Sequence, residues 1–369
     1  MSLQTGRDAL RGVRSAGRIA VMEHLWGLSR EAITHFAGVD PVAEPQRVNE
    51  AFRRLAEAFE MDMVWGGGLP NDPDAVLDWS DGQRVKRNRQ GREVVQWGIF
   101  GTPHSDDGRH LSRIANPTDV DEALAVKPLE LFPDTVEQYH ERFTEAYANM
   151  LKANGQTVLA VPQHYTTTFH WALGMFGFEL LCEVGMSGDE RLPRLMADFA
   201  EVSRRVTTAW SRVEGLEAFI CHDDLTMTSG PIFAPDWYRE FIFPHYASIF
   251  APLREAGVPV IFTSDGDCSM FVDDIFDAGA DGLNFEYSVD LAGLVERYPD
   301  KILIGNMNSH TLAAGSPEQI EAEVRRCVEA GCRAPRFIVN VGGQLTHDIP
   351  IANLETYLDC RKRLSREYA

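Results

Sequence analysis

Short apolar runs alternate with longer amphipathic segments through most of this chain, and this alternation constrains the fold more than any other feature. Runs typical of β-strands lie at residues 19–22, 61–65, 157–161, 217–221, 258–262, 281–285, 301–305 and 336–341. Several lack polar alternation, as expected for strands covered on both faces. The segment between the last two runs carries clear helix signals, with Ser316 as N-cap and Gly331 at its end.

Repeated strand–helix units favour a parallel sheet. Eight of them predict an α/β fold in which residues 1–369 form a single (β/α)8 barrel of the TIM type. A doubly wound sheet is the alternative.

The second strand-to-helix connection is much longer than the others. Residues 66–130 include three consecutive glycines and a hairpin-like basic stretch at residues 83–102. Because this length excludes a single helix, we expect an elaborated βα loop over the catalytic face of the barrel. The basic residues are interpreted either as a solvated hairpin or as a surface that steers an anionic ligand.

The charge of the chain narrows its possible partners. Its 55 acidic and 35 basic residues give a formal net charge of -20, which opposes general binding to nucleic acid or to an anionic membrane. No run approaches the roughly 20 apolar residues of a membrane span, and the N-terminal residues lack a signal-peptide pattern. The six cysteines contain no CxxC pair, which is typical of reduced thiols. We therefore expect a cytoplasmic protein that binds neither nucleic acid nor membrane.

Polar side chains gather directly after the predicted strands, where the strands of such a barrel meet at one mouth. They include Glu23, His24, His164, His222, Asp224, Asp265, Glu286, Asn306 and Gln344. Asp224, Asp265 and Glu286 follow consecutive strands and have no Lys or Arg beside them in sequence. Crowded carboxylates raise one another's pKa or require a cation. We therefore expect a protonated acid, a divalent ion or a cationic substrate at this mouth.

Other polar residues have ordinary structural interpretations. Asp267, Asp290 and Asn308 precede helical patterns and are expected to be N-caps. His170 and His245 lie within helical runs and are expected to pack or to face solvent.

Five ordered segments read HDDLTMTSGPIFAPDWYREFIFPHYASIF, GVPVIFTSDGD, GADGLNFEYSVDLAGL, ILIGNMNSHTL and VNVGGQLTHDIPIANL. Together they resemble the uroporphyrinogen decarboxylase superfamily, from about residue 155 to the C-terminus. The resemblance implies a (β/α)8 barrel and, in many members, a homodimer. It also implies one of two activities: porphyrinogen decarboxylation without a cofactor, or zinc-dependent methyl transfer to or from corrinoid proteins or thiols.

The chain departs from that superfamily where its two chemistries reside. Glu23 and His24 stand where the arginine motif of porphyrinogen-binding members begins. Thr263, Asp265 and Gly343 stand at the positions of the zinc-binding His-x-Cys and Cys residues. The chain is therefore identified as a divergent member that lacks both motifs. A divalent metal such as zinc would need oxygen and nitrogen ligands here, and we expect these to be Asp265, Glu286 and His347, with Asp224, His222 and Glu23 as alternative partners of Asp265.

We expect one-carbon chemistry on a small molecule, as methyl transfer or demethylation linked to a corrinoid protein or to a thiol. In this interpretation Asp224 is the general acid or base, while Asp265 and Glu286 position a metal or a cationic donor. Tyr165, which the resemblance places near the cleft, is the third predicted catalytic residue. The predicted substrate-binding residues are Glu23, His24, His164, His222, Asn306 and Gln344. Decarboxylation with Asp224 or Asp265 as the protonated acid is one alternative, and a non-catalytic barrel that binds a small molecule is another.

Overall fold

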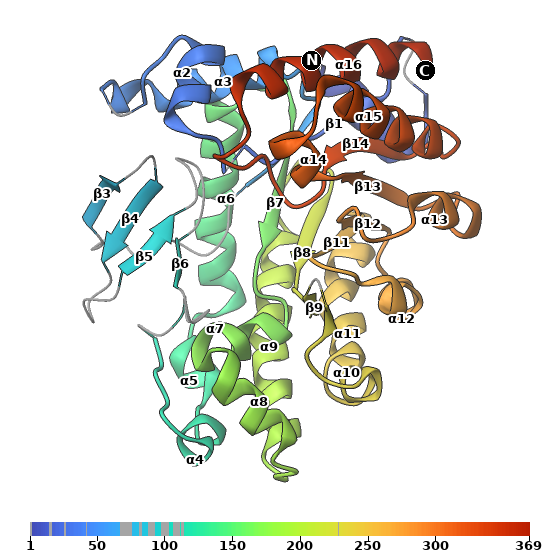
Figure 1. The fold of residues 1–369 in the computed structure, drawn as a ribbon. Helices are drawn as coiled ribbons and strands as arrows, with labels where there is room; N and C mark the ends of the chain where they lie inside the picture. The colour runs from blue at the N-terminus through green and yellow to red at the C-terminus, as the bar shows by residue number, and fades with distance from the viewer. Residues whose placement is uncertain are drawn as a thin grey trace.

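The computed structural model describes residues 2–14, 17–25, 27–41, 43–66, 76–80, 83–87, 93–96, 103–105, 111, 114–227 and 229–369. Its centre is an eight-stranded parallel sheet rolled into a barrel (Figure 1). The strand order is β1-β14-β13-β12-β11-β8-β7-β2. An isolated parallel bridge between Met22 and Met63 joins the two end strands and closes the ring.

The barrel strands are β1 (Ala20–Val21), β2 (Met63–Gly66), β7 (Leu159–His164), β8 (Phe219–His222), β11 (Val260–Ser264), β12 (Gly282–Phe285), β13 (Ile302–Met307) and β14 (Phe337–Val341). Each overlaps one of the eight predicted runs, so the strand prediction and the barrel are confirmed. The strands are buried along their lengths, as in β11 and β14, because helices cover the outer face and side chains fill the interior.

Helices surround the barrel (Figure 1). They are α1 (Leu3–Arg11), α2 (Arg30–Ala37), η1 (Pro45–Arg47), α3 (Val48–Ala58), α4 (Val120–Leu124), α5 (Pro128–Leu131), α6 (Val136–Ala153), α7 (Phe169–Phe176), α8 (Phe178–Met186), α9 (Leu192–Trp210), α10 (Pro235–Phe241), α11 (Phe243–Glu255), η2 (Ser269–Phe271), α12 (Val272–Asp277), α13 (Leu291–Arg297), α14 (Ser309–Ala314), α15 (Pro317–Gly331) and α16 (Ile351–Glu367). Within the described ranges, none of these helices is both long enough and apolar enough to cross a bilayer.

The predicted N-caps Asp290, Asn308 and Ser316 are confirmed, whereas the N-cap of η2 is Cys268 rather than the predicted Asp267. Asp290, Asn308 and Ser316 each accept a hydrogen bond from a backbone amide of the helix that follows. Asp267 accepts one from the amide of Ser269, at the start of η2. These side chains satisfy amides that have no partner within their own helix.

Two small antiparallel sheets stand apart from the barrel sheet. One contains β3 (Val76–Ser80), β4 (Gln83–Arg87), β5 (Glu93–Gln96) and β6 (Pro103–Ser105) in that order. Its β4–β5 pair confirms the predicted hairpin. Much of the predicted loop at residues 66–130, including the basic residues Arg89 and Arg92, lies outside the described residues. The assignment of the whole chain to one domain stays a prediction. The other small sheet is the pair β9 (Thr226–Met227) and β10 (Gly230–Pro231), which follows β8.

Two hydrophobic clusters reveal which way each strand residue points. The larger cluster lies between strands and helices, and the smaller one fills the barrel. The smaller cluster includes Met22, Met63, Val161, Ile220, Ile261, Ile304 and Ile338. Because successive strand residues point to opposite faces, every second residue from these positions also points inward. This phase decides which strand-end side chains reach the mouth.

Candidate active site

The inward phase of β8 and β11 continues to Asp224 and Asp265, and that of β12 to Glu286. The loop after β11 links the three carboxylates. The amide of Asp265 donates to Oδ1 of Asp224 at 3.0 Å, and the amide of Gly266 donates to Oε2 of Glu286 at 3.0 Å. The predicted convergence of these carboxylates is confirmed.

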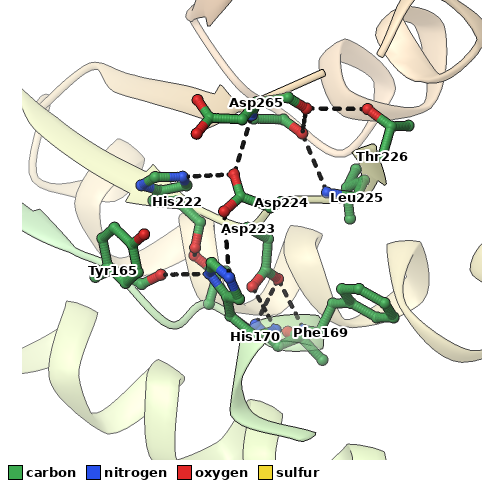
Figure 2. A network of polar contacts seen from close by, with 12 residues as sticks. Tyr165, Phe169, His170, His222, Asp223, Asp224, Leu225, Thr226 and Asp265 are labelled. Carbon is green, nitrogen blue, oxygen red and sulfur yellow. Dashed lines mark hydrogen bonds and ion pairs between the residues drawn. The ribbon is translucent and has the colours of Figure 1, made fainter. Parts of the chain in front are cut away.

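Asp224 lies between two histidines (Figure 2). Nε2 of His222 is 2.8 Å from Oδ1, and Nε2 of His170 is 3.2 Å from Oδ2. Burial alone would raise the pKa of Asp224, but the charges of His222 and His170 and the hydrogen bonds from His222 and the Asp265 amide lower it. Burial also disfavours charged His222, yet the nearby carboxylates, Asp224 first, raise the pKa of His222. Asp224 is therefore ionised near neutral pH.

Asp265 keeps its proton to an unusually high pH. Asp265 is exposed to solvent at the mouth. Partial loss of hydration and then the charge of Asp224 raise the pKa of Asp265 to about 8; His222 opposes this rise and Glu286 adds to it. The site therefore presents a carboxylate beside a carboxylic acid near neutral pH.

Glu286 adds a third acidic group at the edge of this pair. Burial and the charge of Asp224 raise the pKa of Glu286, while the Gly266 amide and His310 oppose the rise. No described Lys or Arg side chain forms an ion pair with Asp224, Asp265 or Glu286; histidines are the ion-pair partners of Asp224. Among the described residues, positive charge beside these carboxylates therefore comes from histidines.

Tyr165, a predicted catalytic residue, lies beside the two histidines (Figure 2). Its ring meets that of His222 edge-on at 4.3 Å between centroids and stacks on that of His170 at 5.1 Å. Burial, followed by the charges of Asp224 and Asp265, raises the pKa of Tyr165 well above its ordinary value. Its phenol keeps its proton, so it can donate a hydrogen bond at the mouth.

His170 corrects the sequence interpretation, because it is a site residue rather than an ordinary packing residue. It lies in the first turn of α7, whose N-terminus is held by Asp223. Oxygens of Asp223 accept hydrogen bonds from the amides of Thr168, Phe169 and His170 at 2.6, 2.9 and 2.8 Å. Tyr246 donates to Asp223 at 2.9 Å. Asp223 thus fixes α7 so that His170 reaches Asp224.

Two predicted substrate-binding residues point away from the mouth, so we leave them out of the site. His164 has the outward phase of β7, and its Nε2 lies 2.9 Å from Oγ of Ser203 in α9. Burial lowers its pKa to about 3. Glu23 has the outward phase of β1; Oε1 lies 3.3 Å from Nη1 of Arg361, and Tyr357 donates to the same oxygen. Burial outweighs these partners and raises the pKa of Glu23 to about 6.

The remaining predicted substrate-binding residues differ in their surroundings. The amide of Asn306 donates to the carbonyl oxygens of Val289 and Glu286 and accepts from Arg326, so it serves the fold. His24 lies inside the barrel, 3.7 Å from Trp65 between ring centroids, and burial lowers its pKa. Gln344 is half-buried in the loop after β14.

The predicted metal ligands do not form one group. Among the described residues, the group with metal-ligand spacing is His222, Asp224 and Asp265, whose ligand atoms lie within 4.8 Å of one another. Asp265 belongs to it, whereas Glu286 and His347 do not. A divalent ion would therefore find its nitrogen ligand at the end of β8 and its oxygen ligands just after β8 and β11.

Sequence reasoning also missed the layer below the carboxylates. Gln163 and Thr263 share the inward phase of Tyr165 and Asp265, two residues earlier on each strand. The sequence could have predicted this layer, because residues two positions before each inward-facing strand-end residue must also face inward.

Comparisons with known proteins agree with this architecture. A sequence model described as "Uroporphyrinogen decarboxylase (URO-D)" matches residues 165–364. The uroporphyrinogen decarboxylase of Hydrogenobaculum sp. (strain Y04AAS1) is 29% identical over 130 residues, which is 35% of this chain and 37% of that protein. The one from Rhodococcus erythropolis (strain PR4 / NBRC 100887) is 39% identical over 98 residues, 26% of this chain and 27% of that protein. These matches span less than half of either relative.

The solved structure of a methyltransferase from Methanosarcina mazei covers 100% of both chains with a TM-score of 0.66 and 16% identity. At this identity the likeness concerns the fold alone.

Proposed function

Because the chain belongs to the uroporphyrinogen decarboxylase family, we propose that it is an enzyme of one-carbon chemistry that transfers a methyl group from a small molecule to a thiol or corrinoid acceptor. One observation carries this proposal: an acid, Asp265, adjoins an ionised Asp224 in a mouth where no described Lys or Arg pairs with either. Such a mouth suits a neutral or cationic methyl donor and repels a polycarboxylate.

Asp265 acts as the general acid in this proposal. When the methyl carbon passes to the acceptor, the electron pair of the broken bond stays on the donor's heteroatom. Asp265 then delivers its proton to that atom, and ionised Asp224 stays in place between His170 and His222. Tyr165 orients the donor through its hydroxyl.

Decarboxylation is the second candidate, and the same acid supports it. The carbon–carbon bond would break with its electron pair on the substrate carbon, carbon dioxide would leave, and Asp265 would protonate that carbon. Without a described arginine partner at the mouth, the substrate would carry a single carboxylate.

A divalent metal such as zinc would bind His222, Asp224 and Asp265 and supply a Lewis acid that activates a thiol acceptor. Metal analysis of the purified protein, and turnover before and after chelation, distinguish this version from proton transfer by Asp265. Loss of turnover on chelation would overturn the metal-free mechanism.

The proposal is tested with a panel of methyl ethers, thioethers and methylamines, each with a thiol acceptor, alongside a panel of monocarboxylates. Methyl transfer is followed by NMR of ¹³C-labelled methyl groups, and decarboxylation by released carbon dioxide. We expect Asp265→Asn to lower kcat by about 10²- to 10⁴-fold. The matched control is Asp267→Asn in the same loop, whose side chain accepts a hydrogen bond from the Ser269 amide.

Full activity of Asp265→Asn would refute the acid role. A ligand that binds without any turnover would indicate instead the non-catalytic binding barrel.

A further inference from the structure

A layer of buried polar side chains lies inside the barrel directly below the carboxylates. It consists of Gln163 in β7, Thr263 in β11, Asn284 in β12 and Asn340 in β14, and we call it the polar belt. All four are at most 5% exposed. They share the inward phase of the apolar residues that fill the barrel, so they point at its axis.

The polar belt contains oxygens that the described protein does not satisfy. Oε1 of Gln163, Oγ1 of Thr263 and Oδ1 of Asn340 are buried and receive no hydrogen bond from any described residue. The orientation of Asn340 follows from its partner, because its Nδ2 donates to Oδ1 of Asn284 at 2.9 Å. Buried polar atoms are normally hydrogen-bonded, so several orphans in one layer point to a ligand that supplies the missing donors.

The chemistry of the lining selects the ligand. The orphan oxygens of the two amides are acceptors, and the Thr263 hydroxyl can accept as well. Above them stand Asp224 and Glu286, whose side chains accept hydrogen bonds from the amides of Asp265 and Gly266, and ionised Asp224 attracts positive charge. Rings of Tyr165 and His222 lie beside the carboxylates. Acceptors, negative charge and aromatic rings together favour a cation that carries N–H groups.

We infer that the substrate is a small cationic amine, whose charge meets the carboxylates of the mouth and whose donor groups bond to Gln163, Thr263 and Asn340 as specificity residues. This inference rests on the proposed function. In the methyl-transfer version, the carbon–nitrogen bond of a methylated ammonium breaks and its electron pair stays on nitrogen. The methyl group forms a bond with a thiolate sulfur, so the thiolate becomes a thioether, and the amine released by this step takes the proton of Asp265.

Binding is tested without turnover, by isothermal titration calorimetry on the full chain. The probe is N,N-dimethylethanolamine, a cation near neutral pH, and the matched control is 3-methylbutan-1-ol, its neutral isostere with carbon in place of nitrogen. We expect stoichiometric binding of the amine, with the alcohol at least about tenfold weaker because it has no positive charge to meet ionised Asp224 and offers no N–H donor.

Two isosteric variants separate ligand recognition from folding. Thr263→Val removes an unsatisfied hydroxyl, so it should weaken amine binding about tenfold while Tm stays the same or rises. Thr207→Val removes a buried hydroxyl that donates to the carbonyl of Ile249 at 2.7 Å, so it should lower Tm and leave amine affinity unchanged.

Equal affinity for the amine and the alcohol, or an unchanged affinity in Thr263→Val, would overturn the inference. So would a loss of Tm in Thr263→Val as large as that in Thr207→Val, since the hydroxyl would then serve the fold. If the amine fails to bind while a methyl ether or a monocarboxylate turns over with dependence on Asp265, the inference falls and the proposed function stands. If the amine binds as expected but kcat is unchanged in Asp265→Asn, the acid role of Asp265 is refuted and the binding inference stands.

Discussion

Replacing Asp224 by Asn should lower the pKa of Asp265. The ligand oxygens of Asp224 and Asp265 lie within 4.8 Å of each other. With an effective dielectric constant of about 20, which allows for solvent screening at the mouth, two unit charges at this distance repel by about 3.5 kcal/mol, or about 2.5 pKa units. The Asp265 pKa, about 8 in the wild type, should therefore fall to as low as about 5.5 in Asp224→Asn.

This shift has a direct consequence at neutral pH. The protonated fraction of Asp265 at pH 7 should drop from about nine-tenths to as little as about one-thirtieth. His222 limits the drop, because losing Asp224 also removes the partner that keeps His222 charged. The partial loss of hydration remains, so the pKa of Asp265 should stay above its ordinary value.

Difference infrared spectroscopy measures this without a substrate. The band of the protonated carboxyl is followed against pH in the wild type and in Asp224→Asn, and the band absent from Asp265→Asn is assigned to Asp265. A midpoint that moves by less than about half a pKa unit would refute the reasoning, because the charge of Asp224 would then contribute little to holding the proton.

Three further predictions concern stability. The folded protein binds the Asp265 proton more tightly than the unfolded chain does, so proton binding at Asp265 stabilises the fold. This stabilisation is full below about pH 4 and is lost as pH rises towards about 8. Asp265→Asn should therefore raise Tm above that of the wild type at about pH 9 and change it little at about pH 4, and equal effects at both would contradict this. Arg361→Leu should lower the free energy of unfolding in urea by about 3–5 kcal/mol, because Glu23 loses its buried partner. The double variant Glu23→Leu/Arg361→Leu should recover most of that loss. An equally unstable double variant would rule out the unpaired Glu23 as the cause. Asp223→Ala should cost about 3 kcal/mol by leaving the amides at the start of α7 unsatisfied, and a loss below about 1 kcal/mol would mean that another group holds α7.

The sequence alone was sufficient for the barrel and for the acidic character of its mouth. Eight apolar runs separated by helical patterns predict a parallel barrel because each unit must bury both faces of its strand. The residue after a strand end lies at the mouth whatever the details of packing, so Asp224, Asp265 and Glu286 could be placed together. The N-caps Asp290 and Asn308 could also be predicted, because a capping hydrogen bond depends on nearby residues alone.

The tertiary structure decided which of two neighbouring side chains faces the mouth. Tyr165 and Asp224 point inward, whereas His164 and Asp223 point to the helices. The sequence could not reveal this phase, because strands buried on both faces show no polar alternation that marks the inner face. Likewise, His170 reaches Asp224 only because Asp223 holds the start of α7, a contact between segments more than fifty residues apart. The proton held by Asp265 depends on these same distances and on the loss of hydration, which exist only in the folded chain.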